Sequence, residues 1–357
     1  MNIFIRDWEV VSPAGVGKQA FTQTARKALA AKNEPSVEAD AMGPFTFKDF
    51  DKKKYLGKKG VRGMDGLGAY ATVASHLLVC SRPELLDSDR SRVGVVLGTG
   101  TGSVKSQIEF IRDLRVLEQV EWVDPIQFPQ TVMNCAAGQV SIWHRFTGVN
   151  TTVSGGYHSG ITAFEYAANA LKQSRVDRVL VGCAEEYSPY SQCLLPVDGR
   201  DLRKTQRLGE GCVIFLAERQ RTEESDIEVI GLQRLAYFNR YDPQQRVDGL
   251  VREITNTRRR NGLNKARLRR ICFNRFSKLE TEIVHELGSR LTDGITINLL
   301  CSNGVIADCM SATTGLQFGL LLAVGSLPDQ APGWDLVLTF DPSGGVAMSI
   351  LRYGAEQ

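Results

Sequence analysis

Residues 149–160 set a strand, a glycine turn and a helix in immediate succession, and this order constrains the fold more than any other stretch. The threonines and valine at 151–153 favour a buried strand, and the two glycines that follow permit a sharp turn. From Ile161 to Leu171 apolar residues recur at three- and four-residue spacing, which predicts a helix. The pattern therefore places one side chain, Tyr157, on an elbow at the N-terminus of that helix.

Such an elbow is a common place for a nucleophile, because backbone N–H groups and the helix dipole favour negative charge there. Tyrosine suits the role poorly, since its phenol titrates near ~10 and is almost wholly protonated at neutral pH. His158 follows directly. An acid–base pair of Tyr157 and His158 is the weaker alternative, because adjacent residues on an elbow point in different directions.

Composition narrows the class of protein. A chain of 357 residues with 43% hydrophobic content can bury a sizeable core. Its net charge of +3 gives no argument for nucleic acid as a partner. The eight cysteines show neither CxxC pairing nor metal-ligand spacing, so we expect buried free thiols in a reducing cytoplasm. There is no signal-peptide pattern and no run of eighteen apolar residues, so we expect a cytoplasmic protein without membrane segment, metal or cofactor.

The chain alternates between predicted strands and helices on both sides of a polar linker at 219–226, which indicates repeated β–α–β units. The glycine-rich turn at 98–102 is weak evidence for a nucleotide, and no acidic residue follows at the Rossmann spacing, so we exclude a dinucleotide site. The expected strands are 1–11, 92–98, 178–186, 208–218, 227–232, 294–300 and 346–352; the expected helices are 21–31, 67–79, 104–118, 130–142 and 161–171, with 124–129 extended.

Three segments together resemble the β-ketoacyl synthases of the thiolase superfamily. They are Gln130-Thr-Val-Met-Asn-Cys-Ala-Ala-Gly138, Phe146-Thr-Gly-Val-Asn-Thr-Thr152 and Tyr157-His-Ser-Gly160. The resemblance implies an α/β, thiolase-like layered αβαβα sandwich of two similar halves, which we assign to residues 1–220 and 227–357.

The same resemblance implies that the catalytic positions are degenerate. Condensing enzymes of this family carry a cysteine at the elbow, and alignment through Ser159-Gly160 puts that cysteine at Tyr157. The stretch 271–282, where the first catalytic histidine is expected, contains no histidine, and the second histidine position falls on Cys309. The final glycine turn keeps Gly344-Gly345 but loses the family's second phenylalanine and its asparagine.

Three functions compete on this basis. The first is a non-catalytic subunit of the chain-length-factor type, which pairs with an active β-ketoacyl synthase as a heterodimer in polyketide, polyene or specialised fatty-acid synthesis. The second is a decarboxylase acting on a malonyl group held by acyl carrier protein, although decarboxylating relatives retain the histidines. The third is an acyl- or carrier-binding module without a ketosynthase partner.

The resemblance also assigns contact residues for the first of these functions. The strand before the elbow is expected to pair across the dimer axis, and the segment ahead of it to line the partner's acyl pocket. The basic run 252–270 is either a solvated helix face or a docking site for an acidic carrier protein. The expected dimer strand comprises Val149, Thr151, Thr152, Val153 and Ser154; the pocket lining comprises Thr101, Gln127, Phe128 and Val132; the docking residues are Arg258, Arg259, Arg260 and Arg267.

Overall fold

The computed structural model describes residues 2–30, 43–117, 119–194, 206–235, 242–292, 297–325 and 333–354. The strands are β1 (Ile3–Ser12), β2 (Gly15–Val16), β3 (Val93–Gly98), β4 (Asn150–Val153), β5 (Arg178–Glu185), β6 (Gly211–Glu218), β7 (Ile227–Leu235), β8 (Arg267–Phe273), β9 (Asn298–Cys301), β10 (Gly333–Phe340) and β11 (Val346–Tyr353). The α-helices are α1 (Lys18–Ala30), α2 (Lys53–Leu56), α3 (Gly66–Ser81), α4 (Glu84–Asp87), α5 (Val104–Val116), α6 (Cys135–His144), α7 (Ser159–Lys172), α8 (Pro189–Cys193), α10 (Pro243–Arg260), α11 (Lys278–Leu291), α12 (Asn303–Ile306) and α13 (Thr313–Gly325).

The strands form one mixed sheet in the order β4-β3-β5-β6-β1-β7-β11-β10-β8-β9, with β2 paired to β1. Each half of this order repeats the other. In the first half β4, β3 and β5 run parallel to one another, β6 is antiparallel to β5, and β1 is antiparallel to β6. In the second half β9, β8 and β10 run parallel to one another, β11 is antiparallel to β10, and β7 is antiparallel to β11. The two halves meet where β1 pairs with β7 over Ile3–Ile5. The predicted α/β architecture of two similar halves is confirmed, while the exact boundaries at 220 and 227 stay a prediction.

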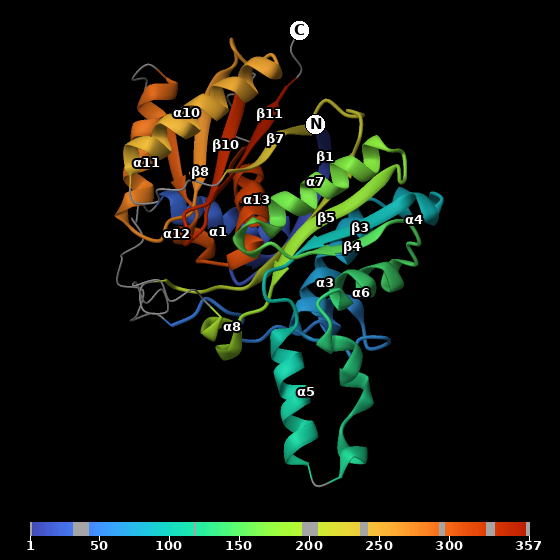
Figure 1. The fold of residues 1–357 in the computed structure, drawn as a ribbon. Helices are drawn as coiled ribbons and strands as arrows, with labels where there is room; N and C mark the ends of the chain where they lie inside the picture. The colour runs from blue at the N-terminus through green and yellow to red at the C-terminus, as the bar shows by residue number, and fades with distance from the viewer. Residues whose placement is uncertain are drawn as a thin grey trace.

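Helices cover the sheet in three layers (Figure 1). Helices α3 and α6 pack on the outer side of the first half, and α10 and α11 on the outer side of the second. Helices α1, α7 and α13 lie between the two halves and share one core with them. In that middle layer the rings of Phe164, Phe215 and Phe318 pack together at centroid distances of 5.0–6.1 Å. The elbow before α7 is therefore anchored at the centre of the molecule.

The structure corrects the prediction for residues 124–142. The stretch expected to be extended is a 3₁₀ helix, Pro125–Thr131, and α6 begins at Cys135 rather than Gln130. The Asp124 carboxylate accepts a hydrogen bond from the Ile126 N–H at 3.0 Å, and a proline at the first helical position adds to this start signal. Sequence periodicity carried no trace of so short a helix.

Residues 104–117 and 119–134 project from the body as an arm, in which α5 runs outward and the 3₁₀ turns Val120–Trp122 and Pro125–Thr131 run back (Figure 1). The rings of Phe110 and Phe128 meet across it at 5.8 Å.

Strand β4 also differs from its prediction. Residues 151–153 were expected to be buried, but they are only half-buried, because within the described residues β4 pairs with β3 alone and forms the edge of the sheet.

The cysteines and membrane-span expectation can be compared with the described part of the chain. All eight cysteines are free, but only Cys183, Cys212, Cys272 and Cys309 are buried, so the expectation of buried thiols is wrong for the other four. Among the described helices, none combines the length and apolar character needed to cross a membrane.

Candidate functional site

The elbow forms as the sequence pattern predicts. Gly156 takes a positive φ of 61°, which turns the chain from β4 into the short 3₁₀ helix Gly156–His158 and then into α7. The Ser159 hydroxyl accepts from the Gly155 N–H at 2.9 Å and donates to the Thr99 carbonyl at 3.0 Å, which fixes the turn against the end of β3. At Gly160 a Cβ would lie 2.8 Å from the Cys183 sulfur, so only glycine lets α7 approach β5 this closely.

Tyr157 occupies the tip of the elbow, and its phenol is engaged. The hydroxyl donates to Oδ2 of Asp308 at 2.9 Å, while Oδ1 of Asp308 accepts from the Met310 N–H at 2.9 Å. The ring meets Phe276 edge to face at 5.2 Å and 88°, and it is 6% exposed. The elbow tip is therefore filled by a packed ring, with its oxygen directed at a carboxyl group.

Burial raises the pKa of both partners and keeps the phenol protonated at neutral pH. Burial, followed by the charge of Asp308, raises the pKa of Tyr157 well above its usual value of 10. Burial raises the pKa of Asp308 to about 6. A phenol held protonated at neutral pH is a poor nucleophile toward a thioester.

The other family-implied positions carry no acid–base group that faces the elbow. Cys309 is buried, its thiol donates to the Ile306 carbonyl at 3.0 Å, and burial raises its pKa well above the usual value. In the loop where the first histidine was expected, Asn274 bonds both the N–H and the carbonyl of Phe340, at 2.7 and 3.0 Å. Asn274 thereby clamps the glycine turn after β10, in which the Asp341 N–H donates to the Gly345 carbonyl at 2.9 Å.

His158 points away from Tyr157, toward a different set of groups. A Cβ at Gly345 would lie 3.0 Å from its Cε1, and burial lowers its pKa against the opposing charge of Asp341. In the described part of the chain no hydrogen bond joins it to the phenol, and its Nε2 is buried without a partner. The geometry therefore does not support the acid–base pair.

Thr101 lies in a buried network rather than on an open wall. Its hydroxyl and its N–H both donate to Oε1 of Glu185, and the Ser311 hydroxyl and the Gly100 N–H donate to Oε2. Beside it, a Cβ at Gly102 would lie 2.7 Å from the Cβ of Met133, so this turn touches the base of the arm. The structure brings Thr101 near the segment that contains Val132, but commits its hydroxyl to Glu185.

The remaining pocket-lining candidates lie on the arm and face solvent. Phe128 is 62% and Val132 49% exposed, and Gln127 is exposed as well. They belong to a larger apolar surface: within the described residues, most exposed large apolar side chains lie on the arm, namely Ile111, Leu114, Val116, Leu117, Trp122, Ile126, Phe128, Val132 and Met133.

The dimer-strand candidates lie next to this surface on the sheet edge. The strand is one residue shorter at each end than expected, with Val149 and Ser154 flanking β4. Asn150 donates from Nδ2 to the Ala137 carbonyl at 2.9 Å, which holds α6 beside the edge strand. On α6, Ile142 is 79% exposed. Helix α6 contacts both β4 and the 3₁₀ helix Pro125–Thr131, so the edge strand, α6 and the arm lie in the same half of the molecule (Figure 1).

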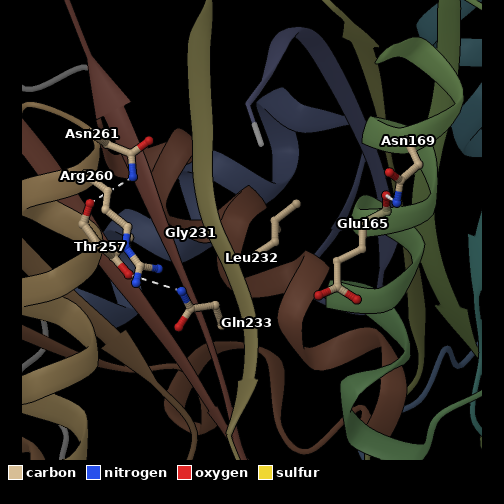
Figure 2. A pocket seen from close by; sticks show the side chains of 8 residues that line it. All are labelled: Glu165, Asn169, Gly231, Leu232, Gln233, Thr257, Arg260 and Asn261. Atoms are coloured by element: carbon tan, nitrogen blue, oxygen red, sulfur yellow. Dashed lines mark hydrogen bonds between the residues drawn. The ribbon is translucent and has the colours of Figure 1, made fainter. Parts of the chain in front are cut away.

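The four candidate docking arginines of the basic run lie in two different environments. The Arg258 guanidinium lies 5.2 Å from the ring centre of Trp334, while Arg259, Arg260 and Arg267 are exposed. Arg260 also lines a cavity of about 510 Å³ between α7, β7 and α10, with Glu165 on its opposite wall (Figure 2). The carrier-docking role of these four arginines stays a prediction.

Sequence analysis missed Asp308 and Phe276, the two residues that close the elbow. Neither had a local signal, because their contact with Tyr157 joins segments more than a hundred residues apart. Among the described residues, no group of His, Cys, Asp and Glu side chains has the arrangement of a metal site.

Comparison with known proteins agrees with this geometry. Residues 48–195 match the family model for the β-ketoacyl synthase N-terminal domain. A stretch of 142 residues is 31% identical to 3-oxoacyl-[acyl-carrier-protein] synthase 2 of Vibrio harveyi, covering 40% of this chain and 34% of that protein. The corresponding synthase of Rhizobium meliloti is 27% identical over 139 residues, covering 38% and 32%. The chain thus matches about a third of the length of these curated relatives.

Solved structures match over nearly the whole chain. The ishigamide ketosynthase/chain length factor is 27% identical, with a TM-score of 0.79, covering 99% of this chain and 100% of that one. A ketosynthase in complex with its chain length factor from Xenorhabdus doucetiae is 14% identical, with a TM-score of 0.74 and coverage of 99% and 98%. At that identity the second likeness shows the fold alone. The chain therefore has the thiolase-like α/β fold of the ketosynthases.

Proposed function

We propose that this chain is a ketosynthase-like subunit of the chain-length-factor type, without condensing activity of its own. The closed elbow carries the proposal: Tyr157 is packed against Phe276 and hydrogen-bonded to Asp308 where a condensing enzyme needs an accessible thiolate. Condensation also needs imidazoles to polarise the thioester; the stretch 271–282, where the resemblance expects the first histidine, contains none, and Cys309 stands where it expects the second.

The partner is an active β-ketoacyl synthase, which supplies the cysteine and the histidines. Two features support a heterodimer. Within the described residues, the outer edge of β4 has no strand partner, so a strand of a second chain could pair with its backbone N–H and C=O groups. The arm holds several large apolar side chains exposed to water, which is typical of an interface that a partner covers.

In that dimer the arm shapes the far end of the partner's acyl pocket, through Gln127, Phe128 and Val132. Acyl carrier protein delivers the chain, and the exposed arginines 259, 260 and 267 are its proposed docking site. This assignment rests on the family resemblance and on the exposure of these residues.

Mass spectrometry and size-exclusion chromatography test the proposal. The purified chain, incubated with acyl-loaded carrier protein, should gain no acyl mass, and Tyr157→Cys should not restore condensation. Mixed with a complete ketosynthase encoded beside it, the chain should elute as a heterodimer. Acylation of Tyr157 or Cys309 contradicts the non-catalytic role, and a monomer that ignores the ketosynthase contradicts the pairing. Carbon dioxide released from malonyl carrier protein by the chain alone favours the decarboxylase.

The shaping role has its own test within the heterodimer. Val132→Trp should shorten the product and Gln127→Ala should lengthen it, while the rate of the first condensation stays nearly unchanged. The matched control is Leu86→Trp, which enlarges an exposed leucine outside the arm. Equal product lengths from the parent, the two arm variants and the Leu86→Trp control would show that the arm does not line the pocket.

A further inference from the structure

A cavity of about 310 Å³ lies where the arm joins the body of the protein. Its walls come from the residues that precede α3, from α5, from the returning turn of the arm and from the end of β5. Four carboxylates line it against two basic side chains: Asp65, Glu109, Asp124 and Glu186 against Arg62 and Lys105. The walls therefore carry an excess of negative charge when all six groups are ionised.

Glu186 is the least solvated of these acids and is only partly satisfied. It is 6% exposed, and its Oε1 accepts from Lys105 Nζ at 3.5 Å. Its Oε2 is buried and has no hydrogen-bond partner among the residues that the structure describes. Gly66 makes room for the carboxylate, since a Cβ at that position would overlap it. A buried carboxylate oxygen without a donor is costly, so a donor that reaches it through the cavity gains free energy.

The neighbouring acid cannot be the group that awaits a ligand. Oδ1 of Asp65 accepts from the Gly68 N–H at 2.8 Å and Oδ2 from the Ser106 hydroxyl at 3.2 Å, so both its oxygens are occupied. Burial, with Asp65 as the next cause, raises the pKa of Glu186 to about 7. A positive charge placed in the cavity would draw the proton from Glu186 and pair with the carboxylate.

The walls favour one class of ligand. An anion is repelled by the excess of carboxylates. A metal ion is disfavoured because the described residues contain no converging set of metal-binding side chains. The volume suits a small organic group. We propose that this cavity binds a small organic cation through its ammonium group, which donates to Oε2 of Glu186.

The ammonium group has two sources, a free amine or the amino end of an acyl chain, and calorimetry distinguishes them. The full-length chain alone is titrated with 1-aminobutane and with 1-butanol, which has the same length without the charge. In parallel it is titrated with 5-aminopentanoyl pantetheine and pentanoyl pantetheine. Saturable binding of 1-aminobutane assigns the site to free amines, and binding of the aminopentanoyl thioester alone assigns it to a chain end. Equal behaviour of each amine and its neutral counterpart overturns the proposal.

Variants place the binding at Glu186. Glu186→Gln keeps the shape and removes the charge, so it should weaken amine binding by about tenfold or more. Glu109→Gln on the cavity wall should weaken it less, and Glu282→Gln on the exposed face of α11 should not change it. Thermal unfolding checks that each variant is folded. Unchanged binding in both cavity variants places the amine elsewhere and overturns the proposal.

The pH dependence supplies a readout that a structural role would not move. Affinity should rise between pH 6 and 8 in the parent chain as Glu186 ionises, and this rise should vanish in Glu186→Gln. The charged and titratable groups that face Glu186 are Asp65 before α3, Tyr70 on α3, Lys105 on α5, Lys52 before α2 and Glu210 before β6. A pH dependence that persists in the variant assigns the titration to one of these groups and contradicts the role of Glu186.

Discussion

The elbow and the arm are built in opposite ways. At the elbow Tyr157 is 6% exposed and its hydroxyl has a buried partner, whereas on the arm Trp122 is 57% and Phe128 62% exposed. The elbow contributes to the stability of the monomer, because its ring and hydroxyl are already satisfied. The arm leaves large apolar side chains in water, as is typical of an interaction surface. The comparison indicates a chain whose elbow side chain is buried and hydrogen-bonded, and whose arm exposes large apolar side chains to solvent.

The largest expected effect is that of substitutions on the arm on association with the ketosynthase. Replacing Trp122 and Phe128 by alanine should weaken association with the ketosynthase about 100-fold, because aromatic anchors dominate interface energies. The control is Leu86→Ala, an exposed leucine outside the arm. Association is measured by analytical ultracentrifugation, and unfolding of the free chain should change little. Equal affinities for the double variant and the control would exclude the arm from the interface.

At the elbow, ionisation of the Asp308 carboxyl group should make the free energy of unfolding fall as pH rises. Its folded pKa of about 6 lies above the unfolded value near 3.9, so the folded state binds the proton more tightly. Its favourable contribution is fully present below pH ~4 and is lost as pH rises through about 6, a change of about 3 kcal/mol at most. Asp308→Asn should remove this slope.

The measurement for Asp308 is urea unfolding of the parent chain and the variant between pH 4 and 8. Glu185 is also buried with a raised pKa, so only the difference between the two proteins reports on Asp308. Identical slopes would show that Asp308 does not carry the titration.

Removing the phenol hydroxyl should have a smaller effect. Tyr157→Phe keeps the contact with Phe276 but leaves Oδ2 of Asp308 unpaired, so the free energy of unfolding should fall by about 1–2 kcal/mol at neutral pH. In Asp308→Asn the same substitution should cost less, because a neutral amide oxygen replaces the carboxylate. A double-mutant cycle with no coupling would show that the hydrogen bond contributes nothing.

The smallest expected effect concerns the basic run. Reversing Arg259, Arg260 and Arg267 to glutamate should weaken carrier-protein binding about threefold at low salt, and added salt should reduce the difference. Lys27, Lys172 and Lys278, all exposed on other helices, are reversed together as the control with the same net charge. Equal binding by both triple variants would show that the run, which spans the end of α10 and the start of β8, is a solvated surface and not a docking site.

The sequence by itself determined the elbow and the elements next to it, but not the 3₁₀ helix Pro125–Thr131 or the helices α10, α11 and α13. Periodicity and β-propensity are local properties, so α7, β5 and the turn at Gly156 could be predicted from the residues that form them. The glycines of the elbow were also predictable from the sequence, because a positive φ and a close helix approach each favour the residue without a Cβ.

Tertiary structure decided what the elbow can do and where the chain is exposed. That Tyr157 meets Asp308, and that β4 is an edge rather than a buried strand, depends on which distant segments pack together. The environment of Glu186 Oε2, which has no hydrogen-bond partner among the described residues, was also decided by tertiary structure, because β5, α3 and α5 together bury it. Burial and pairing are properties of packed segments, and no short stretch of residues encodes them.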